Sequence, residues 1–270
     1  MSLTIIFSFI FGTIIGSFLN VVSLRYNTGG IADGRSKCFS CGKELRWYEL
    51  VPVFSYILIR GRCLRCKSSV SFQYPIIEIL TGLIFALILY KHWPVVSLVS
   101  SLDLLIILAI FSAFIVIAIY DSKHKIIPDG LAYILSFLAL FRAFLLFEIT
   151  GIKAFVIILT AGPLVALPIF LLWFVSKGRW IGFGDVKLSL AIGWLLGPIL
   201  GLSAIIVGFW VGAIFGVTLI LLSKFHLFQN QKMITMKSEI PFGPFLIIGT
   251  LFIYLFPFDV LNLSILISLL

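Results

Sequence analysis

The chain has 270 residues, of which 61% are hydrophobic and only 11% are charged. Soluble globular domains usually carry about 25% charged residues, so this composition excludes an ordinary soluble domain and indicates a multi-span membrane protein. A formal net charge of +9 would suggest nucleic-acid binding in a soluble protein. Here the basic residues crowd between apolar segments, where they orient a chain in the bilayer. We therefore expect a lipid bilayer, and no nucleic acid, as a partner.

Eight apolar segments predict membrane-spanning helices, for which about 20 apolar residues are typical. We expect an all-α polytopic membrane protein with about eight transmembrane helices. The first segment has no basic region before it and no small-residue cleavage site after it, so we expect a retained span and not a signal peptide. Helix breakers between Gly197 and Gly201 separate the sixth span from the seventh. The predicted spans are residues 3–24, 75–90, 95–120, 131–147, 152–175, 187–200, 202–223 and 241–258.

The distribution of basic residues predicts how these spans are oriented. Alternate connections between the spans contain 17 of the 20 Lys and Arg residues, and the positive-inside rule places such connections in the cytoplasm. Both termini are then expected on the opposite side. Asp121 and Asp185, which lie where two spans meet water, both face the cytoplasm in this arrangement, although the rule counts only Lys and Arg.

All four cysteines fall in one polar insertion, residues 25–74, which we call the cysteine lobe. They form two Cys-x-x-Cys pairs that are followed by Gly42 and Lys67, and the 21 residues between the pairs are close to a zinc-ribbon spacing. Four thiolates suit a tetrahedral ion and leave no open position, so we expect structural zinc. Disulfides are one alternative, but the reducing cytoplasm disfavours them. A redox-active cysteine pair is another, but no βαβ pattern surrounds either pair. The predicted zinc ligands are Cys38, Cys41, Cys63 and Cys66.

Asp121 and Asp185 are the strongest candidates for catalysis. An ionised carboxylate inside a membrane helix costs at least about 2.5 kcal/mol, so an acid at membrane depth predicts function. Two carboxylates that lie close together share a proton, which leaves one as a general base for water and the other as a general acid. Asp185 follows Gly182-Phe183-Gly184, where the glycines allow the backbone to approach closely. The pair therefore predicts peptide hydrolysis by an aspartyl dyad.

Other interpretations of the acidic residues stay open at this stage. Asp121 could simply end a helix, and Asp185 could cap the helix that follows it. Asp129 competes with Asp121 for the catalytic role, but it lies in a typical turn and N-cap sequence, so we expect it to be structural. Glu78 and Asp103 lie inside predicted spans and could form ion pairs or pack.

The same residues permit two other classes of function. Intramembrane acids would suit an ion-coupled transporter or channel, but no inverted repeat or broken helix is apparent. A zinc-containing assembly factor without enzymatic activity would also use the cysteine lobe. The sequence contains neither the His-Glu-x-x-His motif of metalloproteases nor the Gly-x-Ser-x-Gly elbow of serine hydrolases.

Six short motifs are spread over nearly the whole chain. In this order they resemble the motifs of the bacterial type IV prepilin peptidases, which are bifunctional leader peptidases and N-methyltransferases. One departure is that Tyr26-Asn27 stands where the family often has Leu-Pro. The motifs are residues 16–22 with Arg25, the cysteine pairs with residues 47–52, residues 74–78, 121–129, 182–185 and 241–245.

The resemblance implies an activity, a substrate and a site. Family members cut the precursors of pilins and pseudopilins behind a short basic leader and then methylate the new amino terminus with S-adenosylmethionine. Asp121 and Asp185 become the protease dyad and the four cysteines the zinc ligands, whereas no residue is assigned to S-adenosylmethionine and Glu78 is only a candidate. A multi-pass protein of the bacterial plasma membrane is implied, with the active site and the cysteine lobe facing the cytoplasm.

The expected domain organisation has three parts. Residues 1–24 form the first transmembrane helix, and residues 25–74 form the cytoplasmic zinc-binding lobe, which is associated with methylation. Residues 75–270 form the membrane-embedded peptidase domain, with about seven transmembrane helices.

Overall fold

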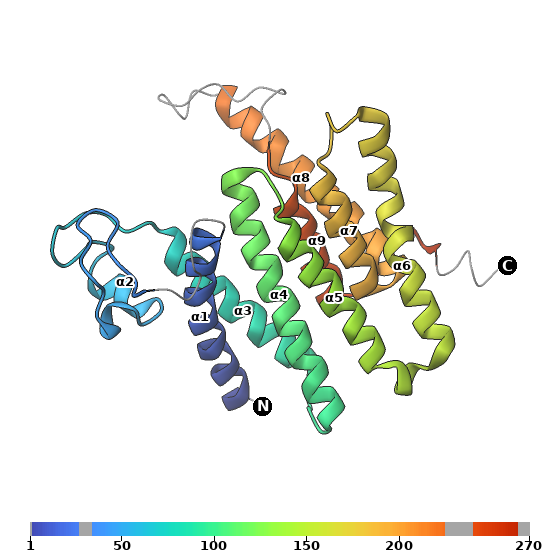
Figure 1. The fold of residues 1–270 in the computed structure, drawn as a ribbon, viewed down its shortest axis with the longest axis horizontal. Helices are drawn as coiled ribbons and strands as arrows, with labels where there is room; N and C mark the ends of the chain where they lie inside the picture. Colours follow the sequence, from blue (N-terminus) through green and yellow to red (C-terminus); the bar gives the residue numbers. More distant parts are fainter. Residues whose placement is uncertain (1, 27–33, 225–239, 264–270) are drawn as a thin grey trace. The chain divides into compact units, whose positions relative to one another are not determined.

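The computed structural model describes residues 2–26, 34–224 and 240–263, and this part of the chain is built from helices and loops (Figure 1). The chain divides into two compact units, Met1–Val116 and Ile117–Leu270, whose boundary falls within one long helix. The first unit contains α1 (Ser2–Arg25), the 3-10 helix η1 (Trp47–Glu49), α2 (Phe54–Leu58), α3 (Gln73–His92) and most of α4 (Leu98–His124). The second unit contains the end of α4, α5 (Asp129–Leu145), α6 (Phe147–Ser176), α7 (Phe183–Leu196), α8 (Pro198–Lys224) and α9 (Gly243–Leu255).

Each of the eight predicted spans coincides with a helix, and the prediction of an all-α polytopic membrane protein is confirmed. Five of the described helices are long and apolar enough to cross a membrane, namely α1, α3, α4, α6 and α8. The other three, α5, α7 and α9, have only 17, 14 and 13 residues. A 14-residue helix is about 21 Å long, shorter than the hydrocarbon layer of about 30 Å. The short helices begin at Asp129, Phe183 and Gly243, beside the acidic residues that the sequence singles out.

The reversal between α7 and α8 is tighter than predicted. The expected spans 187–200 and 202–223 leave the break near residue 201, but α7 ends at Leu196 and α8 begins at Pro198. Only Gly197 connects them, with a φ of 82° that a residue with a side chain rarely adopts. Proline fits the first turn of a helix because the amide there has no intrahelical partner, so one glycine and one proline suffice for the turn.

In the first unit, α1 packs closely on α3. A Cβ atom added to Gly12 would lie 2.8 Å from the Cα atom of Gly82, and one added to Gly16 would lie 2.9 Å from the Cα atom of Glu78. Small residues spaced four apart allow two membrane helices to approach at the distance of backbone contact. The Gly12-Thr-Ile-Ile-Gly16 motif therefore serves helix packing within this chain.

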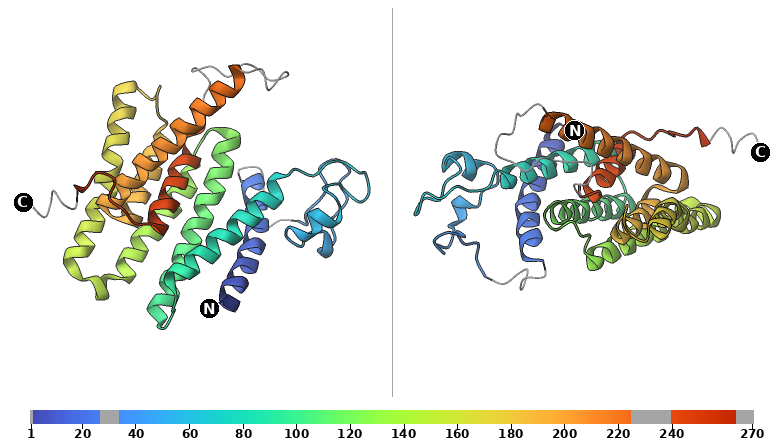
Figure 2. Two further views of the ribbon diagram at one scale, coloured as in Figure 1. Left: turned by 180° about the vertical axis from the view of Figure 1, so that it is seen from behind. Right: turned by 90° about the horizontal axis from the view of Figure 1, so that it is seen from above.

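In the second unit, α7 is the central helix. It contacts α5, α6, α8 and α9, and eight of its 14 residues are buried. The views in Figure 2 also show α8 and α9 crossing beside each other next to α7. Asp185 lies in the first turn of this central helix, so the most enclosed helix of the unit positions one of the two candidate carboxylates.

We predict that Gly12→Ala destabilises the protein and that Gly216→Ala does not. The added Cβ at position 12 meets backbone atoms of α3 at 2.8 Å, and such overpacking typically costs about 1–3 kcal/mol. At Gly216 in α8, the nearest atom to an added Cβ is the Cδ1 atom of Ile240 at 3.8 Å, so alanine fits and improves helix propensity. Thermal unfolding in detergent measures both variants, and equal shifts in the two would contradict this packing.

Candidate active site

The Asp121 carboxyl group is buried at the C-terminal end of α4, the end that the sequence predicts to face the cytoplasm. Its side chain belongs to the last turn of α4, and the residue is only 4% exposed. The N–H group of Gly243, the first residue of α9, donates a 3.0 Å hydrogen bond to Asp121 Oδ2. This N–H group has no partner within its own helix, and the positive end of the α9 dipole favours a negative charge there.

The Asp185 carboxyl group is held in a similar way. Asp185 is 8% exposed, and its Oδ2 atom accepts a 3.2 Å hydrogen bond from the N–H group of Gly182, the residue that caps α7. The helix begins at Phe183, three residues earlier than an N-cap role for Asp185 would require. Asp185 therefore caps the start of its helix from the third helical position, as acidic residues do in a capping box.

Close contacts bring the two carboxylates to one place within the second unit. A Cβ atom added to Gly184 would lie 2.8 Å from Ile127 Cβ, and one added to Gly243 would lie 2.8 Å from Asp121 Oδ2 and 3.4 Å from Ile127 Cδ1. Ile127 thus separates the two glycine backbones, and the Asp121 and Asp185 carboxyl groups lie within range of direct electrostatic interaction. This proximity is what the predicted aspartyl pair requires, because two neighbouring carboxyl groups can share a proton.

Asp129 has a different environment. Its Oδ1 atom lies 2.6 Å from the Lys187 ammonium group, which also lies over the rings of Tyr133 and Phe183. The prediction that Asp129 caps α5 is wrong, because Pro128 holds the N-cap position and Asp129 is the first helical residue. The ion pair instead joins the start of α5 to the first turns of α7. With 64% of its side chain exposed, Asp129 lacks the enclosure of the other two acids.

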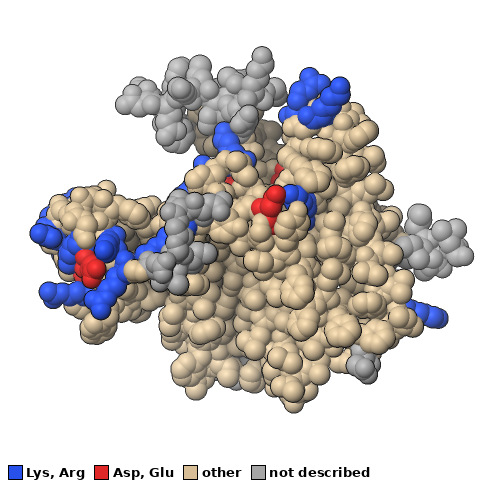
Figure 3. Space-filling model, in the orientation of Figure 1, with Lys and Arg blue, Asp and Glu red and all other residues tan. Residues whose placement is uncertain are grey.

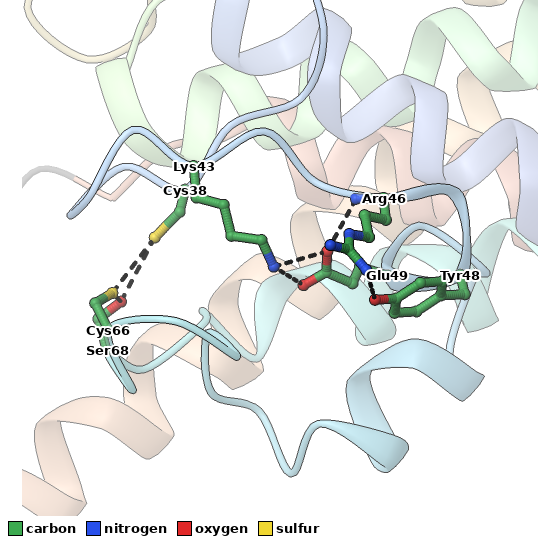
Figure 4. Close-up of polar contacts among 7 residues, drawn as sticks. All are labelled: Cys38, Lys43, Arg46, Tyr48, Glu49, Cys66 and Ser68. Atoms are coloured by element: carbon green, nitrogen blue, oxygen red, sulfur yellow. Dashed lines mark hydrogen bonds and ion pairs between the residues drawn. The ribbon is translucent and has the colours of Figure 1, made fainter.

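The cysteine lobe gathers its four sulfur atoms into one cluster. All four Sγ atoms lie within 4.8 Å of one another, and Cys38 Sγ lies 3.8 Å from Cys66 Sγ (Figure 4). Zinc–sulfur bonds of about 2.3 Å in a tetrahedron separate the sulfurs by about 3.8 Å. The two halves of the cluster have the same geometry, because Gly42 and Lys67 have φ values of 67° and 59° and an isolated β-bridge closes each turn. The cluster can therefore hold the predicted zinc ion.

The protonation of these thiols also fits a bound cation. Backbone N–H groups of Cys41 and Ser40 point at the Cys38 sulfur and lower the pKa of that thiol to about 6. For Cys41, a backbone hydrogen bond from Lys43 favours the thiolate, but burial and the other sulfurs raise the pKa to about 11. Four neighbouring thiolates repel one another, so a divalent cation is what allows all of them to ionise.

An ion pair stabilises the lobe beside the cluster. The Lys43 ammonium group donates hydrogen bonds of 2.9 and 3.1 Å to the two carboxylate oxygens of Glu49, and the Arg46 N–H group donates one of 2.9 Å (Figure 4). Burial acts to raise the pKa of Glu49, but these hydrogen bonds outweigh it and hold the pKa below its usual value. Basic side chains crowd the surface of the lobe, whereas most of the remaining surface in that view is uncharged (Figure 3).

The two remaining acids within predicted spans have different partners. In the first unit, Asp103 Oδ2 lies 3.8 Å from His92 Nδ1, so Asp103 has a basic neighbour. Glu78 accepts a 2.7 Å hydrogen bond from the N–H group of Val53 in the cysteine lobe. Among the residues that the structure describes, no Lys, Arg or His forms an ion pair with Glu78.

Gly243 is the site residue whose role the sequence does not reveal. Its motif, Pro241-Phe-Gly-Pro-Phe245, predicts a helix start, because proline follows at the second helical position. A glycine at a helix start presents a free N–H group and no side chain, which would suit a nearby carboxylate. The identity of that carboxylate could not be inferred, because Asp121 lies 122 residues earlier in the chain.

We predict that the purified protein contains one zinc ion per chain and that Cys63→Ser removes it. Cys63 is a buried member of the cluster, and the loss of one of four ligands opens the tetrahedral site. The lobe should then become sensitive to proteases, since metal binding stabilises such small folds. Ser68→Ala is the matched control, because Ser68 Oγ lies 3.1 Å from Cys66 Sγ without being a ligand. Metal analysis that finds equal zinc in Cys63→Ser and wild type would contradict the assignment.

Comparison with known proteins identifies both units of the chain. Residues 10–92 match the model of the bacterial peptidase A24 N-terminal domain, and residues 106–217 match that of the type IV leader peptidase family. No solved structure matches the chain significantly.

Curated relatives match over most of the chain. A prepilin leader peptidase/N-methyltransferase from Bacillus subtilis (strain 168) is 29% identical over 250 residues, which are 92% of each protein. The protein of that name from Burkholderia pseudomallei (strain 1026b) is 30% identical over 278 aligned positions, covering 90% of this chain and 82% of the relative. One from Myxococcus xanthus (strain DK1622) is 38% identical over 124 residues, which are 46% of this chain but 35% of that protein. The chain therefore belongs to the type IV leader peptidase family.

Proposed function

We propose that this protein is a membrane aspartyl endopeptidase that removes the short basic leader from type IV prepilins or pseudopilins, with Asp121 and Asp185 as the catalytic pair. The observation that carries the proposal is the pair of buried carboxyl groups, each of which accepts a hydrogen bond from a glycine N–H group at a helix start. The names of the relatives supply the substrate class.

The two carboxyl groups would act as base and acid in the same step. The ionised carboxylate removes a proton from a water molecule, which attacks the carbonyl carbon of the scissile peptide bond. The protonated carboxyl group donates its proton toward the carbonyl oxygen, and the amine of the mature product then leaves with a proton. The glycine N–H groups keep both carboxyl groups in place, and none of the described lysines or arginines, which would hold the acids ionised, forms an ion pair with them.

The orientation of the substrate supports a site at this level of the membrane. The basic-residue distribution supports a cytoplasmic location for the ends of α4 and α7 that carry the two aspartates. The leader of an inserted precursor would remain on that side, while the apolar start of its mature part enters the bilayer. The scissile bond would then lie at the depth of Asp121 and Asp185.

Methylation of the new amino terminus, with S-adenosylmethionine as donor, is the second proposed activity. We assign it to the first helix and the cysteine lobe, residues 1–74, together with the start of α3, and peptide cleavage to the rest of the chain. A sulfonium donor requires anionic or aromatic partners, and the lobe offers the exposed rings of Trp47 and Tyr48. Its zinc ion would be structural, because four cysteine ligands leave no position for a substrate.

We predict that Asp121→Asn and Asp185→Asn each abolish prepilin cleavage, lowering the rate at least about 100-fold, because an amide can act neither as base nor as acid. Asp129→Asn is the matched control and should stay within about tenfold of wild type, since an exposed ion pair contributes about 1 kcal/mol or less. Gel-shift cleavage in membranes with equal expression measures all three. Cleavage in both catalytic variants would overturn the proposal and favour an ion-coupled transporter.

We also predict that Gly184→Ala slows cleavage far more than Gly182→Ala. A Cβ atom at position 184 would lie 2.8 Å from Ile127 Cβ, so the backbone beside Asp185 must shift, and misplacement by about 1 Å can cost about 100-fold in rate. At position 182 the nearest atom is Asp185 Oδ2 at 3.5 Å, an ordinary contact. Initial cleavage rates at matched protein amounts decide between them, and equal rates would show that the close contact with Ile127 does not position Asp185.

A further inference from the structure

Glu78 is a buried carboxyl group that the proposed cleavage reaction does not use. It lies in the second turn of α3, near the cysteine lobe, and is 6% exposed. Its Oε2 atom accepts the 2.7 Å hydrogen bond from Val53 N–H, and the Ser17 hydroxyl group of α1 lies beside the carboxyl group. Gly16 of α1 leaves room for this contact, because a Cβ atom there would lie 2.9 Å from Glu78 Cα.

The Val53 N–H group gives Glu78 a hydrogen bond but no compensating charge. In residues 2–26, 34–224 and 240–263, no basic side chain forms an ion pair with it. A carboxylate buried without a cation is costly in an apolar environment. By contrast, Glu49 in the same unit is paired with Lys43. Glu78 therefore has the properties of a site for a cation that the described residues of its own unit do not supply.

The segment that covers Glu78 is strained and lies near the surface. Val53 has φ 63° and ψ −53°, a conformation that is rare for a β-branched residue and costs about 1–3 kcal/mol. This conformation directs the Val53 N–H group at Glu78. Val51 and Phe54, on either side of Pro52 and Val53, are exposed, so the covering segment lies at the surface. An incoming N–H donor that replaced the Val53 N–H group would let this strained backbone relax.

We propose that Glu78 binds the α-amino group that cleavage exposes on the mature substrate and accepts its proton before methyl transfer. This inference rests on the proposed function and adds the residue that recognises the methyl acceptor. The amine lies at the head of an apolar segment, so it would stay at the membrane edge. Glu78 matches this depth, because it lies in the second turn of a membrane-spanning helix beside the lobe.

The proton and the electrons of the transfer can be followed on named atoms. The substrate ammonium group gives one proton to the Glu78 carboxylate and becomes a neutral amine. Its nitrogen lone pair then forms a bond to the methyl carbon of the sulfonium donor while the carbon–sulfur bond breaks, and that electron pair stays on sulfur as a neutral thioether. The substrate ammonium group can donate hydrogen bonds to a carboxylate and has a proton that must leave. A sulfonium group has no N–H group and no such proton. The methyl acceptor is therefore a better match for Glu78 than the methyl donor.

Binding measured without any methyl donor tests the proposal directly. Full-length protein in detergent is titrated with fluorescent peptides of a mature substrate terminus that carry either a free or an acetylated α-amino group. Wild type should bind the free amine at least about tenfold more tightly, as expected for a hydrogen-bonded charge pair. Glu78→Gln should remove this preference, since the amide can still accept from Val53 N–H but has no charge. Asp103→Asn, which alters another buried acid of the same unit, should retain it.

The outcomes separate this inference from the proposed function. Glu78→Gln should still cleave prepilin but leave the mature product without the mass of one methyl group. Wild type that shows no amine preference, or Glu78→Gln that keeps it, overturns the assignment of Glu78. Glu78→Gln could instead keep the amine preference but no longer bind S-adenosylmethionine more tightly than its thioether product. That result would overturn the amine assignment and assign Glu78 to the methyl donor. Failure of wild type to cleave prepilin would refute the proposed function. The comparison of free and acetylated peptides with wild type does not depend on cleavage. It can therefore still contradict an amine site when Glu78→Gln does not fold.

Discussion

The constraint on which this protein depends is the burial of carboxyl groups among apolar helices, where none of the described basic side chains forms an ion pair with them. Asp121, Asp185 and Glu78 are all buried, and each accepts a hydrogen bond from a backbone N–H group. A backbone donor stabilises a carboxylate, but it does not fix the charge as strongly as a lysine or arginine would. Acids held in this way can still gain and lose protons. Glu49 and Asp129 are paired with lysines, which suits a structural role.

Glycines make this arrangement possible because they bring backbone close to the acids. At Gly243 a side chain would meet the Asp121 carboxyl group at 2.8 Å, and at Gly184 it would meet Ile127 at the same distance. Both glycines belong to the starts of short helices, α7 and α9, whose first N–H groups have no partner in their own helix. The positions of the helix starts and the glycines at them are thus parts of one solution, because a helix that began a turn earlier would use those N–H groups for itself.

The sequence predicts features that depend on local spacing and misses those that join distant segments. The eight helices, the cysteine pairs and the two aspartates follow from apolar length, from the spacing of ligands and from the cost of a charge in a membrane. The partners of the aspartates and of Glu78 do not follow, because the bonds to Gly243 and Val53 span 122 and 25 residues. The ion pair of Asp129 does not follow from local spacing either, since Lys187 lies 58 residues away in the chain.

The two proposed reactions make related demands on charge. Cleavage creates an α-ammonium group where a neutral peptide bond stood, so the product carries a cation that the precursor did not have at that position. A carboxylate that already had a basic partner would gain little from this cation, whereas one with only neutral donors gains an ion pair. Glu78, in residues 1–116, is such a carboxyl group with a neutral donor and could pair with the new ammonium group. Asp121 and Asp185, in residues 117–270, also have neutral donors, which suits proton transfer. The same use of backbone donors in place of basic side chains thus accounts for both steps, although the two sites share no residue.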